Sequence, residues 1–284
     1  MSNIRNIKYI FLLNLIRRLD KLNFMKYKLH DMNIENYKVI SGIDGNCDEE
    51  SNNLYVNYLN TLKDEDYSFK DKGKTYIHNK SVFAIIKSFK LIFEQVLNLE
   101  DDEPILILED DVIFHKNFNE YKIDFSYDVI YLGGNQLQWD KIYTSNYSLI
   151  NDKRYITYGL YAIILKAKFI KNFYKDKLNN LNNIRKPLDH MIWEYIVENK
   201  MSNIVHIPNL VIPNLISSDN MLNRDLIKIS KYKRWILKDY RFVNLELKYY
   251  KIYKMSKKMD IRKIKGHIDW LYFDTIYKIV NGEY

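Results

Sequence analysis

The chain has 284 residues, of which 47% are hydrophobic and 28% are charged. This composition is ordinary for a globular protein and excludes a disordered chain; the single cysteine, Cys47, excludes an internal disulfide and a zinc site built on cysteines. The formal net charge of +8 belongs to the end of the chain, because residues 223–284 hold 16 Lys and Arg against 7 Asp and Glu, whereas residues 1–222 are almost balanced. We therefore predict a main domain over residues 1–222 and a basic, aromatic-rich extension over residues 223–284.

The first part of the chain alternates strand-like and helix-like patterns. An apolar strand is predicted over Lys8–Leu13, a helix from Arg17 to Met32, and a second strand over Tyr37–Ser41 that ends in the glycine-flanked turn Gly42–Gly45. Residues 46–76 are polar and rich in turn residues, with weak helical patches such as Leu54–Leu62. We expect an irregular excursion there, either a binding loop or a plain surface insertion.

The later patterns continue this alternation up to residue 207. They predict, in order, a helix over Ser81–Leu97, strands over Pro104–Leu108, Asp128–Leu132 and Tyr158–Leu165, helices over Lys166–Leu178 and from Pro187, and a strand over Asn203–Ile207. This order indicates an α/β fold with an open, mostly parallel, Rossmann-like sheet flanked by helices. The C-terminal extension is predicted to be helical, with its apolar positions at Ile227, Ile229, Trp235, Ile236, Trp270, Leu271 and Ile276.

No apolar stretch approaches the ~20 residues that a membrane-spanning helix needs. The most apolar opening, Tyr9–Leu13, is closed by Asn14 and Arg17, and no small-residue cleavage site follows it. The sequence therefore predicts a cytoplasmic protein.

Three consecutive carboxylates follow the apolar strand Pro104–Leu108. Glu109, Asp110 and Asp111 repel one another, so they need solvent or a cation, and the carboxyl end of a central strand is the usual ligand position in an α/β sheet. Oxygen ligands suit Mn²⁺ or Mg²⁺, and such an ion most often presents a diphosphate. We expect Asp111 to bind the metal directly, Glu109 to bind it through water or to contact a ribose, and Asp110 to be structural or a sugar contact; a solvated acidic turn is the alternative.

Two residues further along the chain are candidates for the same site. Asp189, in the first turn of its predicted helix, could be the base that an acceptor hydroxyl requires, or only a partner of the helix dipole. His206 is a candidate late metal ligand, although a histidine in a strand is more often a core residue.

Taken together, these motifs resemble glycosyltransferase family 25, the lipopolysaccharide-type and collagen-type galactosyltransferases. The resemblance rests on the segments Phe11–Lys21, Ser41–Gly45, Ile107–Val112, Tyr127–Gly133, Tyr158–Leu165 and Pro187–Asp189. It implies a GT-A fold, a UDP-galactose or UDP-glucose donor, Mn²⁺, and inversion at the anomeric carbon. By position it implies that Glu109 and Asp111 serve the metal and the donor, and that Asp189 is the base or an acceptor contact.

The resemblance also implies nucleotide contacts and shows two departures from the family pattern. Asn14, Arg17 and Asp44 would lie near the nucleotide, and Ser88 stands at a serine position that contacts the donor. At the next position Phe89 replaces the usual histidine, and the opening motif ends in Lys21 where the family has arginine.

The leading hypothesis is thus a metal-dependent inverting glycosyltransferase. Its acceptor could be a glycan, a collagen-like protein or a lipid-linked sugar. The replaced histidine motivates the alternative of a non-catalytic GT-A-like module that binds a glycan or a partner. The basic extension favours contact with an anionic surface over nucleic acid, because it contains no recognised nucleic-acid motif.

Overall fold

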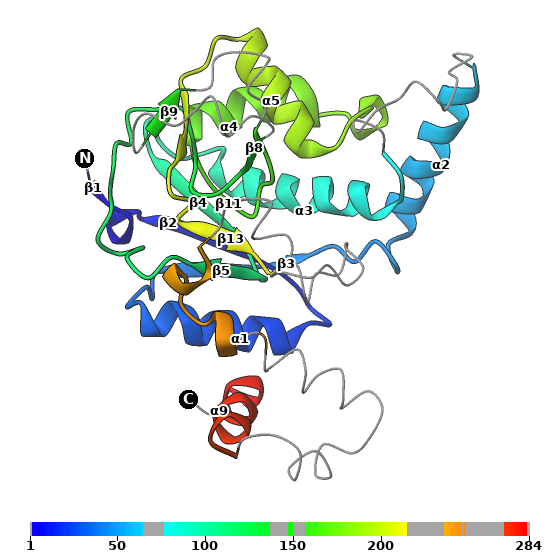
Figure 1. The fold of residues 1–284 in the computed structure, drawn as a ribbon. Helices are drawn as coiled ribbons and strands as arrows, with labels where there is room; N and C mark the ends of the chain where they lie inside the picture. Colours follow the sequence, from blue (N-terminus) through cyan, green and yellow to red (C-terminus); the bar gives the residue numbers. More distant parts are fainter. Residues whose placement is uncertain are drawn as a thin grey trace.

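The computed structural model describes residues 2–64, 77–136, 147–149, 157–214, 236–245, 247 and 270–282. Its described helices and strands surround one central sheet (Figure 1). The strands are β1 (Ser2–Asn3), β2 (Tyr9–Leu15), β3 (Tyr37–Gly42), β4 (Pro104–Glu109), β5 (Val112–Phe114), β6 (Lys122–Ile123), β7 (Val129–Tyr131), β8 (Asn135–Gln136), β9 (Tyr147–Leu149), β10 (Thr157–Tyr158), β11 (Ala162–Lys166), β12 (Asn203–His206) and β13 (Val211–Pro213). The helices are η1 (Ile4–Asn6), α1 (Leu19–Asp31), α2 (Glu49–Asp64), α3 (Ser81–Val96), α4 (Ala167–Phe173), η5 (Tyr174–Leu178), η6 (Leu181–Asn183), α5 (Leu188–Glu198), η7 (Leu237–Asp239) and α9 (Trp270–Asn281).

The central sheet has seven described strands in the order β3-β2-β4-β11-β7-β12-β9. Strands β3, β2, β4, β7 and β12 run in one direction, whereas β11 and β9 run in the other. β11 lies between β4 and β7 and pairs with both. The prediction of a mostly parallel α/β sheet is therefore confirmed.

Both faces of the sheet are covered, because alternate residues of each central strand enter different cores. Ile105 and Ile107 pack with helices α3, α4 and α5 on one face, and Leu106 and Leu108 pack with α1 on the other. Figure 1 shows α1 beneath the sheet and α3, α4 and α5 above it. The continuous apolar runs of the sequence are thus strands that are buried on both sides.

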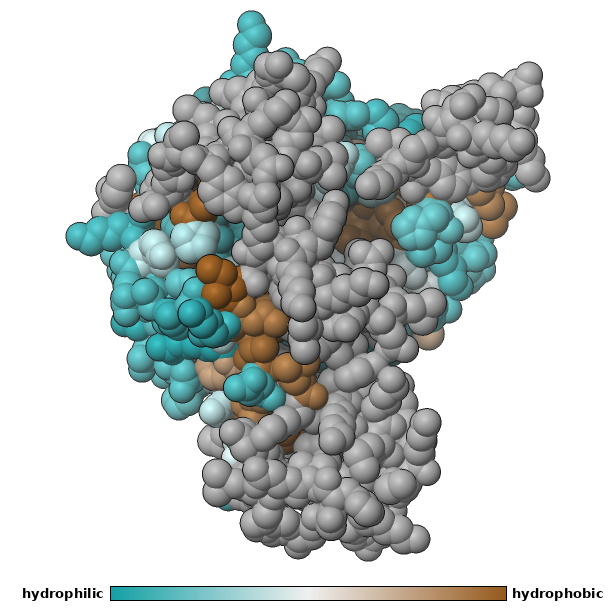
Figure 2. Space-filling view, in the orientation of Figure 1, coloured by the Kyte–Doolittle hydropathy of each residue, from teal (hydrophilic) through white to brown (hydrophobic). Residues whose placement is uncertain are grey.

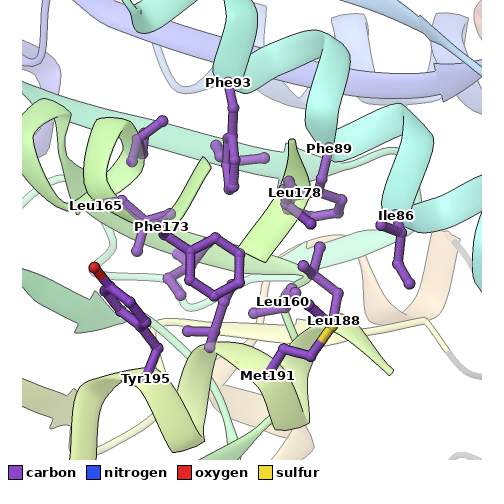
Figure 3. Packing of buried hydrophobic residues seen from close by; sticks show 14 of the residues in the cluster. Ile86, Phe89, Phe93, Leu160, Leu165, Phe173, Leu178, Leu188, Met191 and Tyr195 are labelled. Atoms are coloured by element: carbon purple, nitrogen blue, oxygen red, sulfur yellow. The ribbon is translucent and has the colours of Figure 1, made fainter. Parts of the chain in front are cut away.

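The core above the sheet is aromatic. Figure 3 shows Phe89 and Phe93 of α3 and Tyr195 of α5 closing on Phe173, which stands between the two helices. The rings of Phe93 and Phe173 meet edge to face at 6.2 Å, and those of Phe173 and Tyr195 at 5.3 Å. Such pairs stabilise the packing beyond the area that they bury.

Two of the predicted elements were wrong. Residues 49–64 form the regular helix α2, because Leu54, Tyr58 and Leu62 recur on one face and pack into the core with α3; residues 65–76 lie outside the described residues. The single strand predicted over Tyr158–Leu165 is broken into β10 and β11, because Gly159 between them adopts a φ of +95°, which side chains rarely allow.

The described parts of the C-terminal extension pack on the main fold. Tyr240 and Val243 cover Ile113 of β5 and Ile212 of β13, and α9 lies against α1. Helix α9 confirms the predicted helix at the end of the chain, with Ile276 buried. The predicted apolar positions Ile227, Ile229 and Trp235 lie outside the described residues.

The described surface shown in Figure 2 is mostly hydrophilic, with apolar residues gathered near β5. Within the described residues, no helix is both long enough and apolar enough to cross a bilayer.

Candidate active site

A cleft opens where three neighbouring parallel strands end. Strands β2, β3 and β4 stop at Leu15, Gly42 and Glu109 on the same edge of the sheet, and the cleft between them has a volume of about 150 Å³. Its polar lining includes Arg17, Lys21, Asp44, Asn46, Ser88, Glu109, Asp110 and Asp111. The sheet therefore brings together most of the residues predicted for the site.

The acidic motif is held by contacts from several elements. Asn14 Nδ2 donates to Asp110 Oδ2 at 2.6 Å and to the carbonyl oxygen of Arg18 at 3.1 Å, so Asp110 is fixed to the end of β2. The backbone N–H of Asn214, just after β13, donates to the carbonyl oxygen of Asp111 at 2.6 Å. Asn14, predicted as a nucleotide contact, thus orients a carboxylate and does not itself line the cleft.

Helix α1 places two buried lysines under this motif. Lys21 Nζ lies 3.2 Å from Asp111 Oδ2 and 3.7 Å from Asp110 Oδ1, and Lys28 Nζ donates to the carbonyl oxygen of Val112 at 2.7 Å. Sequence reasoning noted Lys21 only as a departure from the family arginine. The signal that could have identified it is its spacing of seven residues from Lys28, which puts both on the helix face that packs beneath the sheet.

The carboxyl groups carry more negative charge than Lys21 compensates. Burial, together with the charges of Asp111 and Asp110, raises the pKa of Glu109 to about 8. Burial likewise raises the pKa of Asp110 to about 6, while Lys21 and the hydrogen bond from Asn14 oppose that rise. A divalent cation would offset this repulsion and favour the ionised form of both carboxyl groups.

The motif fits Mn²⁺ or Mg²⁺ by its chemistry but does not form a complete cage. Among the described residues, no three His, Cys, Asp or Glu side chains converge as a ligand set. Mg²⁺ and similar ions are usually held by one or two carboxylates together with water and substrate phosphates. Asp111 and Glu109 would supply such carboxylates, and water and substrate phosphates would supply the remaining oxygens.

The opposite wall of the cleft is built on the turn after β3. The guanidinium of Arg17 pairs with Asp44, whose other carboxylate oxygen accepts the N–H of Asn46 at 3.0 Å. Ser88 Oγ accepts the N–H of Ile43 at 2.8 Å and donates to the carbonyl oxygen of Ala84 at 2.7 Å. Ser88 therefore ties this turn to α3 while it also lines the cleft.

Phe89 does not reach the cleft. Its side chain is fully buried and meets Phe93 edge to face at 6.2 Å in the core between α3 and α5 (Figure 3). The residue that replaces the family histidine is therefore a packing residue in this chain. Lys87 of the same helix is buried and paired with Asp48 at 2.7 Å and Glu50 at 2.5 Å, which fixes the start of α2 to α3.

Asp189 stands in the first turn of α5, outside the cleft lining but electrostatically coupled to it. Its Oδ1 accepts the N–H of His190 at 3.0 Å, and its Oδ2 accepts the N–H of Gly159 at a long 3.4 Å. The negative charge of Asp189 contributes to the raised pKa of Glu109, so the two carboxyl groups lie within range of each other's field. The ring of Tyr158 lies 4.2 Å from that of His190, which leaves Asp189 beside an aromatic wall.

His206 is not brought to the cleft. It ends β12 as a buried side chain, its Nδ1 lies 2.7 Å from the carbonyl oxygen of Pro208, and its ring packs edge to face on Tyr121 at 4.8 Å. Burial lowers its pKa to about 4, so the imidazole is neutral at physiological pH. These contacts are those of a histidine that belongs to the core beneath the sheet.

Comparison with protein families gives one match. The sequence model of glycosyltransferase family 25 (LPS biosynthesis protein) matches residues 7–184, which is more than half of the chain and includes the whole cleft lining. Asp189 and His206 lie beyond the matched residues. No curated protein matches the chain.

Proposed function

The chain belongs to glycosyltransferase family 25, and on that premise we propose that it is a metal-dependent, inverting glycosyltransferase that moves galactose or glucose from a UDP-sugar to an acceptor hydroxyl. The observation that supports this most is the cleft at the ends of β2, β3 and β4, where carboxylates form one wall and an arginine, an aspartate and a serine form the other. Such a crevice at the carboxyl ends of parallel strands is where α/β sheets bind nucleotides.

In the proposed complex the donor diphosphate lies against the acidic wall. Asp111 and Glu109 would hold Mn²⁺ or Mg²⁺, which when bound acts as a Lewis acid that neutralises charge on the departing UDP. The hydrogen bond from Asn14 orients Asp110 toward Lys21, so Asp110 has a structural role in the acidic wall. The nucleoside lies toward Arg17 and Asp44.

Asp189 is the proposed base. The proton of the acceptor hydroxyl passes to Asp189 Oδ2, which accepts a long hydrogen bond from the N–H of Gly159. The acceptor oxygen forms a bond to the anomeric carbon while the bond from that carbon to the diphosphate oxygen breaks, so the configuration inverts in one step and UDP leaves with the electron pair. The ring of Tyr158, beside His190, gives a sugar acceptor an apolar face to rest on.

The proposal is tested by incubating the full chain with a panel of UDP-sugars, Mn²⁺ and glycan, collagen-like peptide and lipid-linked acceptors, followed by mass spectrometry of the products. A hexose mass shift that is lost in Asp111→Ala is the expected result. Asp102→Ala is the matched control, because Asp102 is an exposed carboxylate near the opposite end of the same strand. If no donor is consumed by a wild-type chain that binds UDP-sugars, the protein is the non-catalytic binding module instead.

A further inference from the structure

Lys21 occupies a cationic position inside the acidic motif. Its ammonium contacts Asp111 at 3.2 Å and Asp110 at 3.7 Å, only 4% of its side chain is exposed, and it lines the cleft. The carboxylates it contacts are 11% and 12% exposed, so water contributes little to balancing their charge. In this structure Lys21 is therefore the resident counter-ion of the motif.

The ammonium also lies against the carboxylate proposed as the direct metal ligand. A divalent ion bound to Asp111 would lie within a few ångströms of Lys21 Nζ if the lysine stayed in place. Two cations at that separation repel each other strongly in a partly buried site. The lysine must then leave the carboxylate oxygens when a metal enters, and the cleft that it lines is the open space available to it.

We propose that Lys21 and the divalent metal compete for the Asp110–Asp111 carboxylates, so that Lys21 holds the motif in order without metal and sets how much metal the protein needs. This inference deepens the proposed function, because it concerns the metal of the same site. The exchange leaves the ammonium protonated, and one cation replaces another on the carboxylates.

Competition and simple support by Lys21 predict opposite effects of removing the lysine. If Lys21 only orders the carboxylates, Lys21→Met binds Mn²⁺ more weakly. If Lys21 competes, Lys21→Met binds Mn²⁺ about tenfold more tightly or better, because a repelling charge a few ångströms away is gone. Without metal, the same variant loses thermal stability that Mn²⁺ restores.

The test is calorimetric titration of Mn²⁺ into the full wild-type chain, Lys21→Met and Lys28→Met at mildly alkaline pH, with thermal melts with and without EDTA. Lys28 is the matched control, since it is buried on the same helix and donates to the carbonyl oxygen of Val112. Its removal lowers stability and leaves the Mn²⁺ affinity unchanged. Melts identify any variant that fails to fold, and Lys21→Gln, which keeps a polar end, then replaces Lys21→Met.

Equal or weaker Mn²⁺ binding by the folded Lys21 variant overturns the competition. So does an equal gain of affinity in Lys28→Met, which would reflect only the overall charge. If neither the wild type nor the variant binds Mn²⁺, the competition is also wrong. Glycosyl transfer itself is tested separately, by whether the wild-type chain consumes a UDP-sugar.

Discussion

The raised pKa of Glu109 makes the active site a source of instability at alkaline pH. The pKa of this carboxyl is about 8 in the folded chain against an ordinary value of 4.5, because burial and the charges of Asp110 and Asp111 favour the protonated form. A carboxyl with a raised folded pKa contributes stability below its unfolded pKa and loses it as the pH rises through the folded pKa. The folded protein without metal should therefore lose stability between about pH 4.5 and pH 8 through this group.

Substituting Glu109 by Gln removes the ionisation and keeps the shape of the side chain. At about 1.4 kcal/mol per pH unit, the full interval corresponds to at most about 5 kcal/mol. Solvent in the cleft screens part of the repulsion, so we expect Glu109→Gln to raise the free energy of unfolding by about 1 to 3 kcal/mol near pH 9 and to leave it nearly unchanged near pH 5.

Urea unfolding of the wild type and Glu109→Gln at both pH values, with EDTA present, measures this difference. Glu100→Gln is the control, because Glu100 is exposed and its substitution should shift stability equally little at both pH values. A gain in Glu109→Gln that is the same at both pH values, or a loss at the alkaline one, would refute the reasoning. Loss of sugar transfer in the stabilised variant would show that activity requires Glu109 even though its charge destabilises the folded protein.

Three further substitutions follow from particular contacts. Asp189→Asn should lower kcat about 100-fold or more and leave donor affinity unchanged, because Asp189 lies outside the cleft lining. Steady-state UDP release measures kcat, and donor titration measures the affinity. An unchanged kcat would show that Asp189 is not the base. Gly133→Ala should lower the free energy of unfolding by about 3 kcal/mol or more, since an added Cβ would lie 1.8 Å from the carbonyl oxygen of Val211. Urea unfolding that shows wild-type stability would contradict this. Lys87→Met should lower the free energy of unfolding by about 1 to 3 kcal/mol, because it leaves the partly buried carboxylate of Asp48 without its cationic partner. In the same measurement, high salt should reduce the stability difference between the variant and the wild type.

Most of the sheet could be predicted from the sequence because its strands are short apolar runs between breakers. The apolar composition of Pro104–Leu108 and Asp128–Leu132 is enough to predict buried strands. Regular apolar spacing likewise predicts α3. Helix α2 was missed because, among its described apolar residues, only Leu54, Tyr58 and Leu62 are buried, and they are spread among polar neighbours. The three apolar side chains of α2 are buried by packing against α3, a contact that the local sequence does not reveal.

The site could be predicted as a strand end followed by carboxylates, but its internal contacts could not. Asn14 and Asp110 are 96 residues apart, and Lys21 and Asp111 are 90 apart, so only the folded sheet brings them together. Lys87 illustrates the same limit: lysine on a helix normally faces water, and its burial depends on the carboxylates of Asp48 and Glu50 at the start of α2. Such pairs depend on tertiary placement and leave no periodic pattern in the chain.

The position of β11 also has a consequence for synthesis of the protein on the ribosome. β4 and β7 emerge first, yet each needs β11 as a neighbour, and β11 begins only at Ala162. Until then the growing chain carries two apolar strands with an unfilled place between them, and unpaired edges of this kind favour association with other chains. We expect the nascent chain to be most prone to aggregation, and most dependent on chaperones, after residue 131 and before residue 166 has left the ribosome. The central sheet gains β12, the last of its described strands in chain order, only once residue 206 has been made.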